Sequence, residues 1–193
     1  MTKDAFKDRE RGLEEDFFRK SDANLIEKMR EKAHLDEIAA ELAKVLQVEN
    51  PDLLRRVRDL GIDRTTGSAL ILAPLGQVAW AEGKVTDKER EMVLRLAAGR
   101  GVEKGSPAEA QLLAWLDRRP DDAVFQAAIE VIKAGLSHLP LNEREERIAT
   151  IVQACREVSE ASGGIAKVLG VGSGVSAEEQ SVLDVVSAAL RSP

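Results

Sequence analysis

The sequence has few of the residues that mark several common classes of protein. It holds one cysteine, Cys155, in 193 residues, which excludes an internal disulfide framework and favours a reducing compartment. Tyrosine is absent and aromatic residues make up 3% of the chain, so few side chains can stack on bases or sugars. No apolar run reaches the roughly 18 residues of a transmembrane helix, and the first residues are charged. We therefore expect a cytoplasmic protein without a secretory signal.

The charge pattern also reduces the number of functions to be expected. The net charge of −6 argues against general nucleic-acid binding, which uses a basic face. Arg55, Arg56 and Arg58 form a small basic cluster, but Asp52 and Asp59 lie beside it, so a solvated helix face is expected there.

Abundant Ala, Glu, Leu and Arg favour helices, and no alternating pattern indicates a β-strand. The composition therefore predicts an all-α protein. No serine, cysteine or lysine stands in a recognisable nucleophile motif, so nothing indicates an enzyme.

The segment 69–102 is the one around which the rest is organised. An apolar helix leads to Glu82-Gly83-Lys84, where we expect the chain to turn. Thr86 and Glu89 then have the spacing of a capping box, in which a hydroxyl and a carboxylate each bind an unpaired backbone amide. A second amphipathic helix follows. The unit is therefore a helix, an acidic-glycine corner and a capped helix.

Much of this sequence pattern is repeated near the C-terminus. Residues 175–180 (VSAEEQ) echo residues 85–90 (VTDKER), and residues 158–164 (VSEASGG) echo residues 78–84 (VAWAEGK). A glycine-rich insert, 165–174, separates the two halves of the second copy. We therefore expect two helix hairpins, related by an approximate twofold axis, that close one bundle.

The chain divides into three predicted parts. Residues 1–48 form a long charged helical arm, residues 49–68 hold a short helix and a linker, and residues 69–193 form a bundle. The whole fold is an all-α bundle of about seven helices with short loops. Apolar residues on the arm recur at spacings of three, four and seven, a stripe too narrow to bury the helix alone. The arm is therefore expected to pack on the bundle, to pair in a homodimer, or to bind a partner protein.

Caps and breaks predict where the helices begin and end. Asn50 and Pro51 are expected to start a short helix that Gly61 ends in a left-handed conformation. Pro74 lies inside a helical pattern, so it either kinks that helix or marks its first turn. Asn142 is expected to cap the long helix that follows.

Residues 70–190 resemble the TerB-like family, which is named for tellurite resistance. The resemblance rests on VAWAEGKV at 78–85 with Glu89, and on the second copy at 161–163 and 175–183. The family pattern is an Ala-Asp-Gly corner, a branched residue, and a capped helix that carries a Glu. The resemblance implies a compact all-helical domain with pseudo-twofold repeats. It also implies a role in stress responses, often at or near membranes within larger complexes.

Glu82, Asp87 and Glu89 surround the first corner and are the candidate metal ligands. Carboxylate oxygens suit hard cations, and some TerB-like proteins are reported to bind divalent metal through the corner aspartates. The resemblance therefore implies a site for Ca²⁺, Mg²⁺, Mn²⁺ or Zn²⁺, although this chain has Glu82 and Ser162 where the family has aspartate. The alternative is that Thr86 and Glu89 cap the helix and Asp87 complements its dipole.

A second, shorter resemblance covers residues 5–31. This stretch is similar to the inhibitor proteins of rotary ATP synthases, both mitochondrial and zeta-type bacterial. It implies a helical arm that enters a subunit interface of the catalytic head and blocks rotation. The residues that carry it, and that would bind the partner protein, are Phe6, Arg9, Glu10, Phe17 and Phe18.

Two functions are therefore expected. The first is a non-catalytic, stress-response binding or scaffolding protein of the TerB-like type, in the cytoplasm or in a membrane-associated complex. The second is a regulatory inhibitor of a rotary ATP synthase that acts through the arm.

Overall fold

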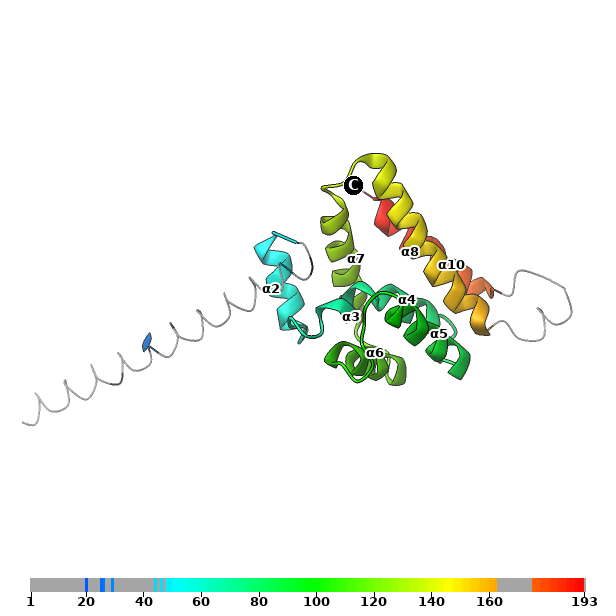
Figure 1. The fold of residues 1–193 in the computed structure, drawn as a ribbon, viewed down its shortest axis with the longest axis horizontal. Coiled ribbons are helices and arrows are strands. Elements are labelled where there is room, and N and C mark those ends of the chain that lie inside the picture. The colour runs from blue at the N-terminus through cyan, green and yellow to red at the C-terminus, as the bar shows by residue number, and fades with distance from the viewer. Residues whose placement is uncertain are drawn as a thin grey trace, which may run out of the picture. The chain divides into compact units, whose positions relative to one another are not determined.

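A computed structural model of the protein describes residues 48–162 and 175–192, together with a few single positions before them. Within these residues the chain forms eight helices and no strand (Figure 1). The predicted all-α fold class is confirmed. None of the described helices combines the length and the apolar composition that crossing a membrane requires. The single positions described before residue 48 are Lys20, Leu25, Ile26, Met29, Lys44 and Leu46.

The chain forms two compact units, Met1–Ala40 and Glu41–Pro193. All eight helices belong to the second unit. Leu46 and Val48 are buried in its core. Both lie at the end of the stretch 1–48 predicted as the arm, where the apolar face is wider, and their side chains fill core positions of the second unit.

The helices of the second unit surround a short central one. α4 packs against α3, α5, α6, α7, α8 and α10, while α2 packs against α7. α8 and α10 pack against each other and run side by side (Figure 1). The elements are α2 (Pro51–Asp59), α3 (Gly67–Ile71), α4 (Ala73–Ala79), α5 (Asp87–Ala98), α6 (Pro107–Asp117), α7 (Asp122–Leu136), α8 (Leu141–Ser162) and α10 (Ala177–Arg191).

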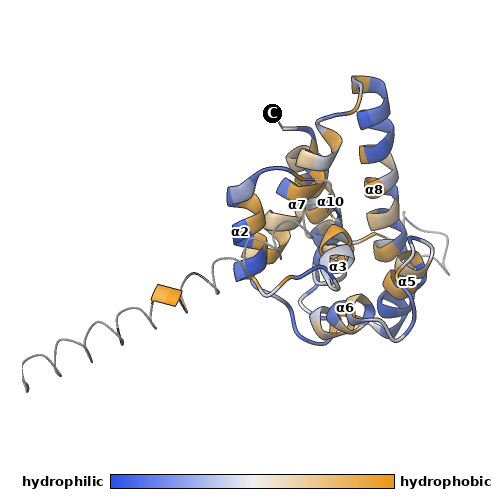
Figure 2. Ribbon diagram, turned by 60° about the vertical axis from the view of Figure 1, so that its left-hand side comes forward, coloured by the Kyte–Doolittle hydropathy of each residue, from blue (hydrophilic) through white to orange (hydrophobic). Residues whose placement is uncertain are grey.

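α4 is buried along almost its whole length. The six buried residues are apolar or small, and only Gln77 is partly exposed. The helix begins after a break at Leu72, and Pro74 lies in its first turn, where a missing N–H costs no hydrogen bond. Of the two alternatives for this proline, the first-turn position is therefore correct. The other helices bury one face each, and Figure 2 shows polar and apolar residues alternating around α2 and α8.

Most of the predicted helix ends are confirmed. Asn50 Oδ1 accepts hydrogen bonds from the backbone N–H of Asp52 at 3.0 Å and of Leu53 at 3.1 Å, so it caps α2. Gly61 ends that region with φ of +80°. The predicted cap at Asn142 is wrong. α8 begins at Leu141, so Asn142 is already a helical residue, and the carbonyl of Pro140 accepts the N–H of Arg144 at 2.9 Å.

Two glycines give opposite predictions for stability. At Gly76 of α4, an added Cβ would meet no atom within 4 Å outside its own helix, and its backbone is helical. Gly76→Ala should therefore raise the free energy of unfolding by about 0.5–1 kcal/mol, since alanine is the better helix former. Gly83, in the turn before α5, also has open space but a φ of +78°. Gly83→Ala should lower the free energy by about 1–2 kcal/mol.

Urea unfolding of the full chain, with circular dichroism as the probe, measures both changes. Because neither glycine has a steric neighbour, the pair isolates backbone conformation from packing. Destabilisation by Gly76→Ala, or no loss of stability in Gly83→Ala, would contradict the account.

Candidate functional site

The first corner joins α4 to α5 and has the predicted capping box. Thr86 is the N-cap of α5, and its Oγ1 accepts the N–H of Glu89 at 3.3 Å. In return, Glu89 Oε2 accepts the backbone N–H of Thr86 at 2.7 Å and its hydroxyl at 2.8 Å. The carboxylate therefore satisfies a backbone donor that helix geometry leaves free.

The second corner has the same arrangement at the start of α10. Ser176 Oγ accepts the N–H of Glu179 at 3.2 Å, and Glu179 Oε2 accepts the N–H of Ser176 at 2.7 Å. The sequence echo thus corresponds to two capping boxes of the same type. The insert 165–174, which would complete the second corner, lies outside the described residues.

The two capping-box glutamates are buried, with 2% of Glu89 and 1% of Glu179 exposed. Burial raises the pKa of Glu89, and hydrogen bonds from Thr86 act in the opposite direction. The negative charges of Glu179 and Glu82 raise that pKa further. The two boxes therefore lie close enough for their carboxylates to repel each other through the protein interior.

The three predicted metal ligands are not gathered into one site. Glu82 and Asp87 are exposed, while Glu89 is buried and turned toward the backbone of Thr86. In the part of the chain that the structure describes, no group of three or more His, Cys, Asp or Glu is placed to hold a metal ion. Metal binding by Glu82, Asp87 and Glu89 stays a prediction, and the geometry fits the capping alternative better.

The five predicted partner-binding residues, Phe6, Arg9, Glu10, Phe17 and Phe18, lie outside the described residues. Three neighbouring apolar residues on the same stretch are described. Leu25, Ile26 and Met29 are helical, and 57%, 50% and 64% of their surfaces are exposed. We call these three residues the apolar stripe. Exposed side chains of this size commonly mark a contact surface when they lie together.

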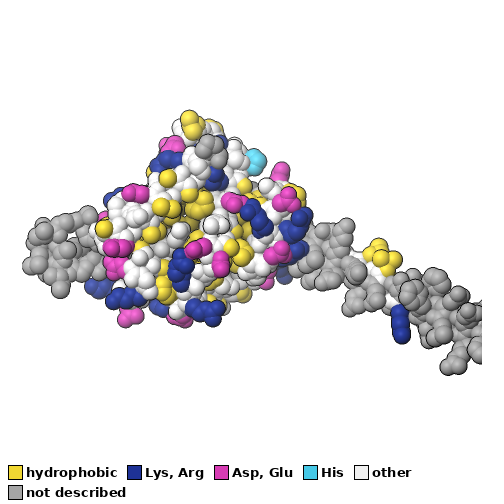
Figure 3. Space-filling view, turned by 180° about the vertical axis from the view of Figure 1, so that it is seen from behind, with side chains coloured by type: hydrophobic (Ala, Val, Ile, Leu, Met, Phe, Trp, Pro, Cys, Tyr) yellow, Lys and Arg dark blue, Asp and Glu magenta, His cyan; other side chains and the backbone are white. Residues whose placement is uncertain are grey.

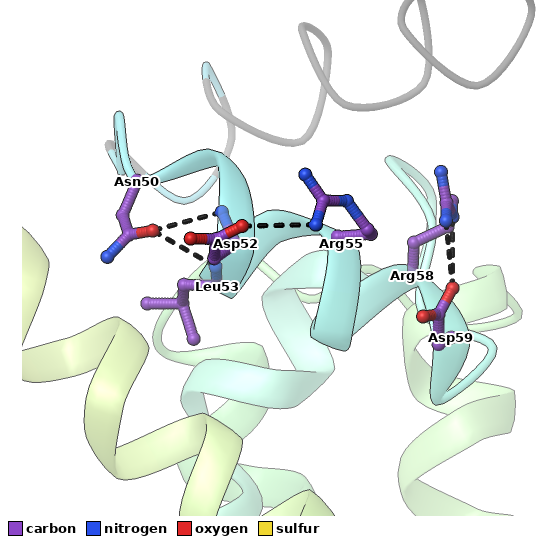
Figure 4. Close-up of polar contacts among 6 residues, drawn as sticks. All are labelled: Asn50, Asp52, Leu53, Arg55, Arg58 and Asp59. Atoms are coloured by element: carbon purple, nitrogen blue, oxygen red, sulfur yellow. Dashed lines mark hydrogen bonds and ion pairs between the residues drawn. The ribbon is translucent and has the colours of Figure 1, made fainter. Parts of the chain in front are cut away.

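The arginine cluster of α2 is neutralised by its surroundings. Figure 4 shows Arg55 paired with Asp52 and Arg58 paired with Asp59, at 3.0 Å and 2.9 Å. Arg56 makes an ion pair with a glutamate of α7. Each guanidinium therefore has an acidic partner, as expected for a solvated helix face rather than a phosphate-binding one.

Trp80 and Cys155 are two further side chains that could bind or react. Trp80 is held by a hydrogen bond, and Cys155 by burial. Trp80 lies just after α4, and its Nε1 donates to the carbonyl oxygen of Trp115 at 2.8 Å, which ties the first corner to α6. Cys155 is fully buried, and desolvation raises the pKa of its thiol to about 12. A thiol in this state is not a nucleophile near neutral pH.

One feature of the second unit has no counterpart in the sequence patterns. A cavity of about 500 Å³ lies where α4, α7 and α10 meet. Gln77 of α4 contributes a polar group to it, and α7 and α10 contribute most of its apolar wall. Its residues come from opposite halves of the chain, so only the packing of the three helices brings them together.

Glu89→Gln tests the electrostatics of the paired boxes. A folded-state pKa above the ordinary value of 4.5 means that the fold favours the protonated carboxyl. The stability contribution of Glu89 is therefore fully present below that value and is lost as pH rises through the folded-state pKa. Glutamine keeps an acceptor for Thr86 without the charge. The variant should gain stability relative to the wild type as pH rises from 4.5 to neutral.

The measurement is the free energy of unfolding in urea across this range, with Glu91→Gln on the exposed side of α5 as the matched control. This control removes one exposed carboxylate from the same helix. A Glu89→Gln variant that follows the control at every pH would contradict the burial argument.

No protein family, no curated protein and no solved structure matches this chain. The resemblances to TerB-like proteins and to ATP synthase inhibitors therefore stay predictions from the sequence.

Proposed function

We propose that this chain is a non-catalytic binding or scaffolding protein of the TerB-like type, which serves a stress response by holding a protein partner. The observation that carries the proposal is the apolar stripe of the unit Met1–Ala40, formed by Leu25, Ile26 and Met29. The second unit supplies the stable domain to which the captured partner becomes linked.

The geometry of the apolar stripe suits a helix-in-groove contact. Residues 25, 26 and 29 are helical. Residue 29 lies four positions after residue 25 and three after residue 26, and side chains at these spacings are neighbours on a helix surface. Fully burying an apolar side chain of this size stabilises a complex by about 1.5–3 kcal/mol relative to leaving it exposed. Each of the three is at least half exposed, so a partner with an apolar groove has a substantial area to cover.

The described polar groups support a binding role over a catalytic one. Glu89 and Glu179 hold backbone amides, and Cys155 is a buried neutral thiol. Acidic and basic side chains are interspersed on the face of the second unit drawn in Figure 3. A face of mixed charge has no strong positive potential to attract a polyanion such as a nucleic acid. This supports a protein as the partner.

Changing the apolar stripe should abolish partner capture. The variant Leu25→Gln, Ile26→Gln, Met29→Gln keeps helix-favouring residues while removing the apolar surface. Used as bait in a lysate, the full chain should retain a partner that the triple variant loses. The control is Leu141→Gln with Val185→Gln, two exposed apolar positions of the second unit (72% and 58%). Equal capture by the wild type and the triple variant would refute the proposal.

Inhibition of a rotary ATP synthase is the second candidate. The observation that favours it is that the described positions of the first unit, Lys20, Leu25, Ile26 and Met29, are helical. A helical segment is what insertion into a subunit interface requires. Full-length protein added to purified enzyme should then slow ATP hydrolysis, and Phe17→Ala with Phe18→Ala should relieve the effect. Undiminished hydrolysis at high excess of the protein excludes this candidate.

A further inference from the structure

Sulfur atoms that an oxidant could modify are few in this chain. The sequence has three methionines and one cysteine, and Met1 lies outside the described residues. The other three sulfur atoms belong to Met29, Met92 and Cys155, and their surroundings differ. Because a peroxide oxidises a thioether or a thiolate only where it can reach the sulfur, the exposure of each side chain decides which one reacts.

Cys155 and Met92 are both protected from oxidation. Cys155 is fully buried, and desolvation raises the pKa of its thiol to about 12, so the reactive thiolate is scarce near neutral pH. Met92 is half-buried on α5, and Arg95 Nη2 donates to its sulfur at 2.8 Å. This contact occupies a lone pair of the sulfur, and the positive charge draws electron density away from it. The reaction of Met92 with a peroxide is therefore slowed.

Met29 is the most exposed of these three side chains, with 64% of its surface accessible. It also belongs to the apolar stripe, because Leu25 and Ile26 lie four and three positions before it on the helix. Its thioether is thus part of the surface that a partner would cover. An unbranched, flexible methionine suits such a contact, since it adapts to the shape of an apolar groove.

We propose that Met29 is a redox-sensitive modification site, at which a hydroperoxide oxidises the thioether and so weakens the partner contact of the apolar stripe. In this reaction a lone pair of Sδ attacks the terminal oxygen of the peroxide, the O–O bond breaks and an S–O bond forms. The proton of the transferred oxygen passes to the leaving oxygen. The thioether is oxidised to the sulfoxide, and the hydroperoxide is reduced to water or an alcohol.

The sulfoxide places a polar S–O group in the middle of the apolar stripe. An apolar groove that covers this group must take its oxygen out of water without offering a hydrogen bond, which opposes binding. Methionine sulfoxide reductases restore the thioether by oxidising two thiols to a disulfide, and the oxygen leaves as water. The modification is therefore reversible. Its effect on the partner rests on the proposed function, whereas the reactivity of Met29 does not.

Peptide mapping by mass spectrometry tests the reactivity. The full-length protein is treated with hydrogen peroxide, the peroxide is removed with catalase, and the sulfoxide fraction at each methionine is followed over time. Met29 should be oxidised several times faster than Met92. Equal rates, or faster oxidation of Met92, would overturn the proposal. This measurement needs no partner.

Two variants, Met29→Leu and Met92→Leu, test the effect on the apolar stripe, because leucine keeps an apolar side chain of similar volume that peroxide does not oxidise. After peroxide treatment, the wild type and Met92→Leu should bind a hydrophobic-interaction column more weakly and capture the partner about tenfold less well. Met29→Leu should keep both properties. Sulfoxide reductases with dithiothreitol should restore both properties in the wild type.

Loss of both properties in peroxide-treated Met29→Leu would place the sensitive group elsewhere and reject Met29. Unchanged column retention and capture by a wild-type chain whose Met29 is fully oxidised would equally overturn the proposal. If the untreated chain captures no partner, the proposed function fails, while the oxidation rates and the column retention still decide whether Met29 is the sensitive residue.

Discussion

The burial of α4 is the constraint on which the rest of the second unit depends. A helix of seven residues has little stability of its own in water, so its conformation comes from the helices packed around it. Its buried small residues Ala73 and Ala79 leave room for the neighbouring helices. Leu75 and Val78 fill the spaces between them, and both are buried. α4 therefore acts as the common packing partner of helices from both halves of the chain.

The two capping boxes fix the starts of α5 and α10, helices that pack on α4 and α8. Each box uses a glutamate whose carboxylate lies inside the protein, where a charge is unfavourable unless hydrogen bonds compensate it. At Glu89 burial outweighs those hydrogen bonds, since the net direction is a raised pKa. The same acidic residue that resembles a metal ligand in the sequence is thus a structural acceptor in the fold.

Local chemistry explains which features could be predicted from the sequence. Thr86 and Ser176 lie three residues before a glutamate, and Asn50 directly precedes Pro51. In each case the cap depends only on residues within one helical turn. The prediction that Asn142 caps a helix was wrong, because α8 already begins at Leu141, directly after Pro140. The pattern of charges also could not show that Glu82, Asp87 and Glu89 would point to different surroundings.

Long-range packing explains what the sequence could not predict. The cavity brings Gln77 together with residues of α10 that are more distant in sequence than any local motif extends, and no spacing rule connects them. The electrostatic influence of Glu179 on Glu89 depends in the same way on how α5 and α10 meet around α4 and α8. In both cases the residue types are ordinary, and only the packing of the helices brings them together.

Native-state hydrogen exchange of the full-length protein tests most directly whether α4 is the central element. If the second unit is organised around it, the amides of Val78 and Ala79 should exchange only through global unfolding and share the slowest rates in the chain. Their exchange should therefore follow the free energy of unfolding measured in denaturant. Fast local exchange at Val78 and Ala79, while α7 and α8 stay protected, would show that the bundle does not depend on α4.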